Sequence, residues 1–196
     1  MPDIDLALLK KLREQTGAGV LESKEVLAEA DNDLEKAIDL LRKKGQAKAL
    51  KKQSRATREG VIGNYLHPNK KVATLIEVSC ETDFVARTED FQNFAHDLAM
   101  QVAASSPQYL GPEDVPKEEI NREKEVALES PDVRGKPEKV VEKIVQGKLE
   151  KFFQENCLLK QKFVKDDDKT IEQLLNEAVS KFGENIQIGN FVKFQL

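Results

Sequence analysis

The feature that most restricts the fold of this chain is a change of periodicity near residue 60. Residues 72–80, VATLIEVSC, form a β-branched run whose length suits a well-buried strand. A shorter apolar run at residues 61–66 precedes it, and HPNK at residues 67–70 supplies turn residues between the two. Residues 60–80 are therefore predicted to form a β-hairpin.

Before that change, apolar residues recur at the three- and four-residue spacing of helices. TGAG at residues 16–19 tolerates the positive φ angles that end a helix, and DND at residues 31–33 supplies a turn and an N-cap. Three short helices are therefore predicted over residues 1–45. Their apolar positions are Leu6, Leu8, Leu9, Leu12, Val20, Leu21, Val26, Leu27, Ala30, Leu34, Ala37, Ile38 and Leu41.

Helical spacing returns after the hairpin, in segments that proline and glycine separate. These segments are residues 91–102, 116–130, 137–153 and 171–182. The three consecutive aspartates at residues 166–168 are expected to form an acidic, solvated turn. Apolar alternation at residues 186–194 predicts one or two terminal strands. Residues 60–196 are therefore predicted to be an α+β core.

The charge is distributed unevenly along the chain. From Arg42 to Arg58 there are eight basic residues and no acid, which leaves 23 basic and 35 acidic residues elsewhere. Gly45 is expected to end the third helix or to bend it, and residues 46–59 to form a solvated helix or a linker at a domain boundary. Eight charges could also tether RNA, although no aromatic residue lies in the run to stack on bases.

Composition excludes several classes of protein. No stretch approaches the roughly 18 to 20 uninterrupted apolar residues of a membrane helix. The first residues, MPDIDLALLKK, lack the basic start and the apolar run of a signal peptide. Cys80 and Cys157 lie far apart and form no CxxC pair, which fits neither a disulfide framework nor a zinc site. A cytoplasmic protein is predicted.

Residues suited to covalent catalysis are scarce. His67 and His96 are the only histidines and belong to no HExxH motif, and the chain has neither GxxxxGK[ST] nor GxGxxG. The TGAG sequence lies between helices rather than after a strand, so it cannot form a dinucleotide cradle. Residues 166–168 lack the spacing of an EF-hand loop. We expect no catalytic residue, no cofactor and no metal ion.

The most informative segment is CETDFVAR at residues 80–87, where the predicted strand gives way to a helix. Asp83 and Phe84 stand side by side there, at the end of a sheet. In one interpretation the aromatic ring anchors a partner while the carboxylate accepts a charge or an N–H group. In the alternative, Phe84 is a hydrophobic staple under the helix and Asp83 is the N-cap. Physical reasoning alone favours the alternative.

Two motifs change that weighting because they agree with one family in content, order and separation. They are TDFVAR at residues 82–87 and LREQTGAGVL at residues 12–21, and with them the chain resembles the translation elongation factor Ts family. Further matches are found at residues 59–63, 91–100, 135–137, 142–144, 163–164 and 183–186. The resemblance therefore covers essentially the whole chain.

The resemblance implies a fold and an activity. The fold is a UBA-like three-helix domain at residues 1–45, similar to ubiquitin-associated domains, a basic linker at residues 46–59, and an α+β core of antiparallel sheet with packed helices at residues 60–196. The activity is that of a guanine-nucleotide exchange factor, which binds the GDP-bound GTPase elongation factor Tu and promotes GDP release. No cofactor and no specific nucleic acid are implied.

The resemblance also implies which residues bind elongation factor Tu. They are Arg13, Val20, Leu21, His67, Thr82, Asp83, Phe84 and Val85. In the family, the tip that matches residues 82–85 contacts the GTPase domain, and its aromatic ring wedges between two helices. The three N-terminal positions grip another helix. His67 matches a turn position that carries an interface histidine in some relatives.

The chain departs from the family in a few places. The usual Met-Met pair is Val20-Leu21, which keeps an apolar contact with less adaptability, and Lys162 replaces the usual proline. At 196 residues the chain resembles the short form of the family, in which some members form a homodimer through the core sheet. A ubiquitin-type adaptor remains an alternative function, although the TGAG turn lacks the apolar loop that such adaptors present.

Overall fold

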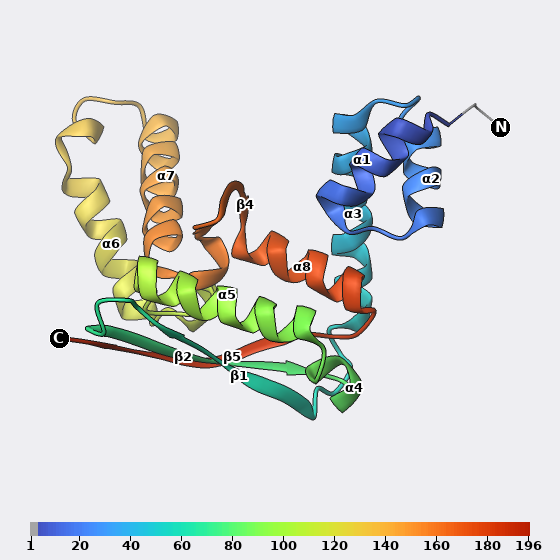
Figure 1. Ribbon diagram of the computed structural model, residues 1–196. Helices are drawn as coiled ribbons and strands as arrows, with labels where there is room; N and C mark the ends of the chain where they lie inside the picture. Colours follow the sequence, from blue (N-terminus) through green and yellow to red (C-terminus); the bar gives the residue numbers. More distant parts are fainter. Residues whose placement is uncertain (1–3) are drawn as a thin grey trace. The chain divides into compact units, whose positions relative to one another are not determined.

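Helices precede, separate and cover the strands of this chain, as Figure 1 shows. The computed structural model describes residues 4–196, so residues 1–3 of the predicted N-terminal domain lie outside the described residues. The helices are α1 (Leu6–Thr16), α2 (Val20–Glu29), α3 (Leu34–Lys52), α4 (Asp83–Ala86), α5 (Glu89–Ser105), α6 (Lys117–Glu129), α7 (Glu138–Asn156) and α8 (Ile171–Phe182). The strands are β1 (Glu59–Leu66), β2 (Val72–Cys80), β3 (Lys162–Phe163), β4 (Asp166–Thr170) and β5 (Gln187–Gln195). The α+β prediction is confirmed.

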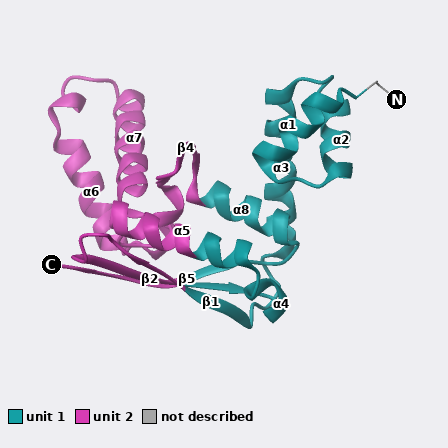
Figure 2. Ribbon diagram, in the orientation of Figure 1, with its two compact units in different colours: residues 1–62, 77–95, 172–188 teal, residues 63–76, 96–171, 189–196 magenta. Residues whose placement is uncertain are grey.

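Residues distant in sequence gather into two compact units, coloured separately in Figure 2. The first unit contains the chain up to residue 62 together with residues 77–95 and 172–188. The second contains residues 63–76, 96–171 and 189–196. The division into domains at 1–45, 46–59 and 60–196 stays a prediction.

Among the three N-terminal helices, the end of α1 and the start of α3 lie at residues expected to cap them. Asp5 precedes α1 and accepts a hydrogen bond from the backbone N–H of Ala7 at 2.8 Å. Gly17 ends that helix with a φ of 67°, which favours glycine. Asp33 caps α3 by accepting from the N–H of Lys36 at 3.1 Å. The buried core of these helices consists of Leu9, Leu12, Val26, Leu27, Ala30 and Ala37.

Helix α3 continues without a break through Gly45 and ends at Lys52. The expectation that Gly45 ends the helix is therefore wrong. A β-carbon at Gly45 would lie 3.3 Å from Ser180 Oγ and 3.9 Å from the carbonyl oxygen of Asn176, both in α8. The glycine therefore serves close packing between two helices of the first unit.

The main sheet has the strand order β1-β2-β5. The predicted hairpin is confirmed, since the N–H of His67 donates to the carbonyl of Val72 at 2.9 Å across the turn between β1 and β2. Directly after the end of β5, the N–H of Leu196 donates to the carbonyl of Lys71, which directly precedes β2, at 3.0 Å. The end of β5 therefore lies beside the start of β2, and the two strands run antiparallel. Residues 186–194 thus contribute one strand rather than two.

Alternate side chains of β2 are buried, as a strand with one covered face requires. They are Thr74, Ile76, Val78 and Cys80. Gly60 in β1 approaches this strand so closely that a β-carbon there would lie 2.3 Å from the carbonyl oxygen of Val78. Only glycine fits at that position without displacing backbone.

A short ribbon in the second unit contradicts one expectation. Strands β3 and β4 pair antiparallel, so the aspartates at residues 166–168 lie in a strand and do not form a turn. Aspartate has a low strand propensity, but tertiary contacts override it here. The buried side chain of Gln101 in α5 accepts from the N–H of Val164 at 2.9 Å and donates to the carbonyl of Lys162 at 3.1 Å. These bonds fix the ribbon.

Within residues 4–196, none of the helices is both long and apolar enough to cross a bilayer.

Candidate functional site

The tip, residues 82–85, follows the end of β2 and forms the start of α4. Thr82 is the N-cap, because its Oγ1 accepts from the N–H of Val85 at 3.5 Å. Asp83 is the first helical residue, and its carboxylate pairs with Arg87 at 3.0 Å. The Phe84 side chain is 82% exposed. The staple-and-cap alternative is therefore wrong, since a threonine holds the cap and the aromatic ring lies in solvent.

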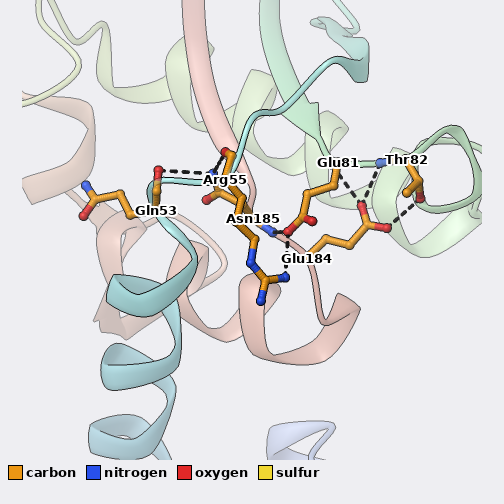
Figure 3. Close-up of polar contacts among 6 residues, drawn as sticks. All are labelled: Gln53, Arg55, Glu81, Thr82, Glu184 and Asn185. Carbon is orange, nitrogen blue, oxygen red and sulfur yellow. Dashed lines mark hydrogen bonds and ion pairs between the residues drawn. The ribbon is translucent and has the colours of Figure 1, made fainter.

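One carboxylate holds the start of α4 in place. Glu184, after the end of α8, accepts from the backbone N–H groups of Glu81 and Thr82, both at 3.0 Å. Its second oxygen accepts from the Thr82 hydroxyl at 2.6 Å. We call these three hydrogen bonds the tip brace; Figure 3 shows them. A charged acceptor makes stronger hydrogen bonds than a neutral one, so the brace fixes the backbone that precedes Phe84.

The neighbouring residues connect the tip to the segment after α3 (Figure 3). The N–H of Asn185 donates to the Glu81 carboxylate at 2.6 Å, and Arg55 pairs with the same carboxylate at 3.4 Å. The Asn185 side chain donates to the carbonyls of Arg55 at 2.7 Å and Gln53 at 3.4 Å. The hydrogen bond from Asn185, aided by the charge of Arg55, lowers the pKa of Glu81.

The N-terminal candidates lie at the turn between α1 and α2. The Arg13 Nε donates to the carbonyl of Ala18 at 3.3 Å, which ties the end of α1 to the glycine-rich turn. Val20 and Leu21 begin α2 and are 42% and 77% exposed. The sequence pattern predicts both in the apolar stripe of that helix, but the buried apolar positions are Val26, Leu27 and the following Ala30. Both side chains are therefore free for contact with another molecule.

His67 lies in the turn between β1 and β2 and is exposed. Its Nδ1 accepts from the N–H of Asn69 at 3.4 Å, and its ring lies edge-on to that of Tyr65, with centroids 6.3 Å apart. His67 belongs to the second unit, whereas the tip and the N-terminal candidates belong to the first. The structure thus brings Thr82, Asp83, Phe84 and Val85 together, and it gathers Arg13, Val20 and Leu21 separately.

The basic segment from residue 42 to residue 58 is partly neutralised. Lys44 pairs with Glu29 at 2.8 Å, and Lys48 pairs with Glu22 at 2.6 Å. Burial lowers the pKa of Lys52. Much of this segment is helical, as part of α3, and several of its charges are engaged within the chain. Fewer cations therefore remain to attract a polyanion than the sequence alone suggests.

Cys80 and Cys157 are both buried, and neither forms a disulfide. Burial raises the pKa of Cys157 to about 11, and the carboxylates of Glu113 and Asp114 act in the same direction. Burial also raises the pKa of Cys80. Both thiols are therefore protonated and weakly nucleophilic near neutral pH. Across residues 4–196, no cluster of three or more His, Cys, Asp or Glu side chains is arranged to hold a metal ion.

Sequence reasoning did not single out the residues that hold the tip. Glu184 and Asn185 entered it only as part of a matched motif, and Glu81 only as a neighbour of Asp83. The available signal was the position of an acid and an amide directly after the helix-ending Gly183, which has a φ of 75°. That position alone does not reveal a contact with residues about a hundred places away in sequence.

The fold and the tip together define an α+β protein that presents an exposed aromatic side chain on a short, braced helix. A family model described as elongation factor TS matches residues 7–196. The elongation factor Ts of Thermosipho melanesiensis is 55% identical over 191 residues, which cover 97% of each chain. That of Syntrophomonas wolfei is 52% identical over 193 residues, which cover 98% of this chain and 90% of the relative. That of Thermotoga maritima is 50% identical over 194 residues, which cover 99% of this chain and 96% of the relative.

The chain therefore belongs to the elongation factor Ts family, one of the families of translation elongation factors. The resemblance inferred from the TDFVAR and TGAGVL motifs is confirmed over nearly the full chain.

Proposed function

We propose that this protein is a guanine-nucleotide exchange factor that binds GDP-bound elongation factor Tu and promotes GDP release during translation elongation. The observation that supports this most is Phe84, an aromatic side chain 82% exposed on a helix that the tip brace holds. Exposed aromatic residues at fixed positions are typical of binding hot spots. Relatives named elongation factor Ts support the same role. The role implies a cytoplasmic protein that performs no covalent chemistry.

Exchange of this kind follows from thermodynamic linkage. A factor that binds the nucleotide-free form of the GTPase more tightly than the GDP-bound form must weaken GDP binding by the same ratio. Inverting the populations of two states from 1:99 to 99:1 requires about 5.5 kcal/mol of differential affinity. A few well-packed anchor residues supply free energies of that order. The protein needs only surfaces that fit one state of its partner better than the other.

The candidate residues divide this work. Phe84 inserts between two helices of the GTPase domain and disturbs the site that holds the phosphates and the magnesium ion of the partner. Asp83, Thr82 and Val85 shape the surface around the ring. Arg13, Val20 and Leu21 grip a further helix and keep the complex in register, and His67 adds a separate contact.

The direct test is release of labelled GDP from purified elongation factor Tu. We expect Phe84→Ala to lower kcat/KM for release at least about tenfold, since loss of a hot-spot aromatic side chain costs about 2 kcal/mol or more. Because the ring is exposed, the melting temperature should hardly change.

Leu128→Ala provides the matched control, since it also removes an exposed apolar side chain, from α6. It should leave GDP release unchanged. An unaltered release rate for Phe84→Ala contradicts the proposed contact, and a wild-type protein without effect on GDP release contradicts the proposed function.

We further propose a homodimer that forms through the core sheet, supported by the alternation of side chains in the second unit. Three sheet residues contact α5. The Tyr65 ring lies 5.7 Å from the ring of His96, measured between centroids. The Thr74 hydroxyl donates to the carbonyl of Ala99 at 2.7 Å, and the Lys193 ammonium donates to the carbonyl of Ala103 at 2.8 Å. Neighbouring side chains point to the opposite face. They are exposed and apolar, namely Leu66, Leu75, Val192 and Phe194.

A second copy of the chain would cover this face and remove apolar surface from water. Sedimentation of the wild-type protein should therefore give a dimer, and Phe194→Glu should give a monomer because it places a charge among apolar side chains. Leu128→Glu, which adds the same charge on α6, should remain a dimer. A monomeric wild-type protein at micromolar concentration contradicts this proposal.

The alternative adaptor functions have less support. RNA binding would rest on the basic segment, where Lys44 and Lys48 are already paired with carboxylates. Binding of ubiquitin would rest on the N-terminal helices alone, and titration with ubiquitin tests it directly.

A further inference from the structure

Two adjacent residues in the turn after α8 hold segments that lie far away in sequence. Glu184 accepts three hydrogen bonds from Glu81 and Thr82, which form the tip brace. Asn185 is 3% exposed and donates to the carbonyls of Gln53 and Arg55. All six residues belong to the first unit, so these contacts lie within one compact body.

The turn that contains Glu184 and Asn185 is itself held in place by hydrogen bonds to Glu81. The N–H of Asn185 donates to the Glu81 carboxylate at 2.6 Å, which points back from the strand end toward the turn. Glu81 thus donates its backbone N–H to Glu184 and accepts with its side chain from Asn185. Because Asn185 is buried and bonded to Glu81, the neighbouring Glu184 is held in position as well. The Glu184 carboxylate therefore has little freedom to move away from α4.

Helix α4 needs such support because it has little of its own. It spans four residues, far fewer than a helix requires for independent stability. Its only buried residue is Ala86, and Phe84 contributes almost no contact to the interior. Apolar packing therefore cannot define the direction in which Phe84 points. The hydrogen bonds of the brace remain as the main constraint on the backbone that carries it.

We propose that Glu184 is a positioning residue for the exchange reaction, which holds Phe84 and Asp83 in the orientation that the partner GTPase meets. The inference rests on the proposed function. Its physical basis is preorganisation: a side chain already held in its bound orientation loses less conformational entropy on binding. Glu184 does not touch the partner; it acts through Thr82 and the start of α4.

The test compares three proteins in the GDP-release assay with elongation factor Tu. Glu184→Ala removes all three acceptors and should lower kcat/KM about tenfold, the size of effect that a displaced contact group produces. Glu184→Gln keeps one oxygen facing the two backbone N–H groups and should restore most of the activity. Glu142→Ala, an exposed glutamate in α7, is the control and should match the wild type.

A second measurement separates positioning from a general loss of stability. Affinity for nucleotide-free elongation factor Tu is measured for Glu184→Ala in the wild type and in a background that carries Asp83→Ala and Phe84→Ala. If Glu184 acts through the tip, the change costs less than about twofold in that background, because coupled residues are not additive. Equal losses in both backgrounds overturn the proposal.

Hydrogen exchange gives a readout that does not require the partner. Glu184→Ala should speed exchange of the amides of Glu81 and Thr82, and exchange in α7 should remain unchanged. Unchanged protection of those two amides overturns the brace. Wild-type acceleration of GDP release together with full activity of Glu184→Ala overturns the positioning role alone, whereas a wild-type protein that leaves GDP release unchanged contradicts the proposed function.

Discussion

Two phenylalanines in consecutive helices have opposite surroundings. Phe84 in α4 is 82% exposed, whereas Phe91 in α5 is completely buried. The Phe91 ring lies 5.5 Å from that of Phe182 and 6.4 Å from that of Phe94, measured between centroids. The chain can therefore bury an aromatic ring in this part of the first unit, and the exposure of Phe84 is a property of α4 rather than a shortage of interior space.

The two regions also differ in what holds them. Apolar contacts with α8 hold Phe91, while hydrogen bonds to Glu184 hold the backbone that precedes Phe84. Packing contributes stability in proportion to the apolar area buried, whereas a polar brace leaves the apolar ring available to a partner. Neighbouring helices are thus held by different kinds of contact, one by apolar packing and the other by hydrogen bonds, and under the proposed function the second leaves its ring for recognition.

The largest expected effect is the loss of stability on truncation of the buried ring, Phe91. Phe91→Ala should lower the free energy of unfolding by about 3 to 5 kcal/mol, because it removes a buried ring and leaves a cavity. Phe84→Ala should change it by less than about 0.5 kcal/mol, as exposed positions usually do. Urea denaturation measures both.

Activity should reverse the order of the two variants. At temperatures where Phe91→Ala remains folded, we expect its GDP-release activity to stay near that of the wild type, while Phe84→Ala loses most of it. A Phe84→Ala protein as unstable as Phe91→Ala contradicts the view that the two rings have separate tasks.

Apolar periodicity was sufficient to predict the core side of this comparison. The three- and four-residue spacing of Phe91, Phe94, Ala95, Leu98, Ala99 and Val102 predicted the buried face of α5, and all six are buried. Such a pattern repeats over several turns, so packing and local propensity agree. The family motif named Asp83 and Phe84, whereas local rules alone favoured a staple that the structure does not contain.

What the sequence could not supply depends on contacts between distant residues. The aspartates at residues 166–168 form part of a strand because Gln101 fixes the neighbouring ribbon, and no local pattern announces that bond. The brace joins Thr82 to Glu184 across 102 positions, and the two lie in separate motifs. Gly45 suggested a helix end, but its contact with α8 explains the glycine without one.

A smaller loss of stability is expected from a change at Thr82, the residue through which Glu184 holds the tip. Thr82→Ala removes both the N-cap of α4 and the hydroxyl that donates to Glu184. It should lower the free energy of unfolding by about 1 to 2 kcal/mol, the usual range for loss of a threonine cap. Thr82→Ser keeps the hydroxyl and is the matched control, so it should recover most of that loss. Equal losses in the two variants contradict the brace.

The smallest effect concerns pH and the Glu81 carboxylate, which links the tip to Asn185. The hydrogen bond from Asn185 holds the pKa of Glu81 below its usual value of 4.5 in the folded protein. The ionised carboxylate therefore stabilises the fold above about pH 4.5, and this contribution is lost as the pH falls through the lowered folded pKa.

Glu81→Gln should consequently show a shallower loss of stability below pH 4.5 than the wild type. The difference should be below about 1 kcal/mol, because the group is partly exposed and its ion pair with Arg55 is screened by solvent. Urea denaturation between pH 3 and pH 6 measures it, with the exposed Glu142→Gln as the control. A neutral amide at position 81 still accepts from Asn185 but carries no charge, so near neutral pH Glu81→Gln should be less stable than the wild type by that same small amount, and the two should converge at low pH. An acid dependence identical to that of the wild type would mean that Glu81 does not link the tip to the rest of the first unit through its charge.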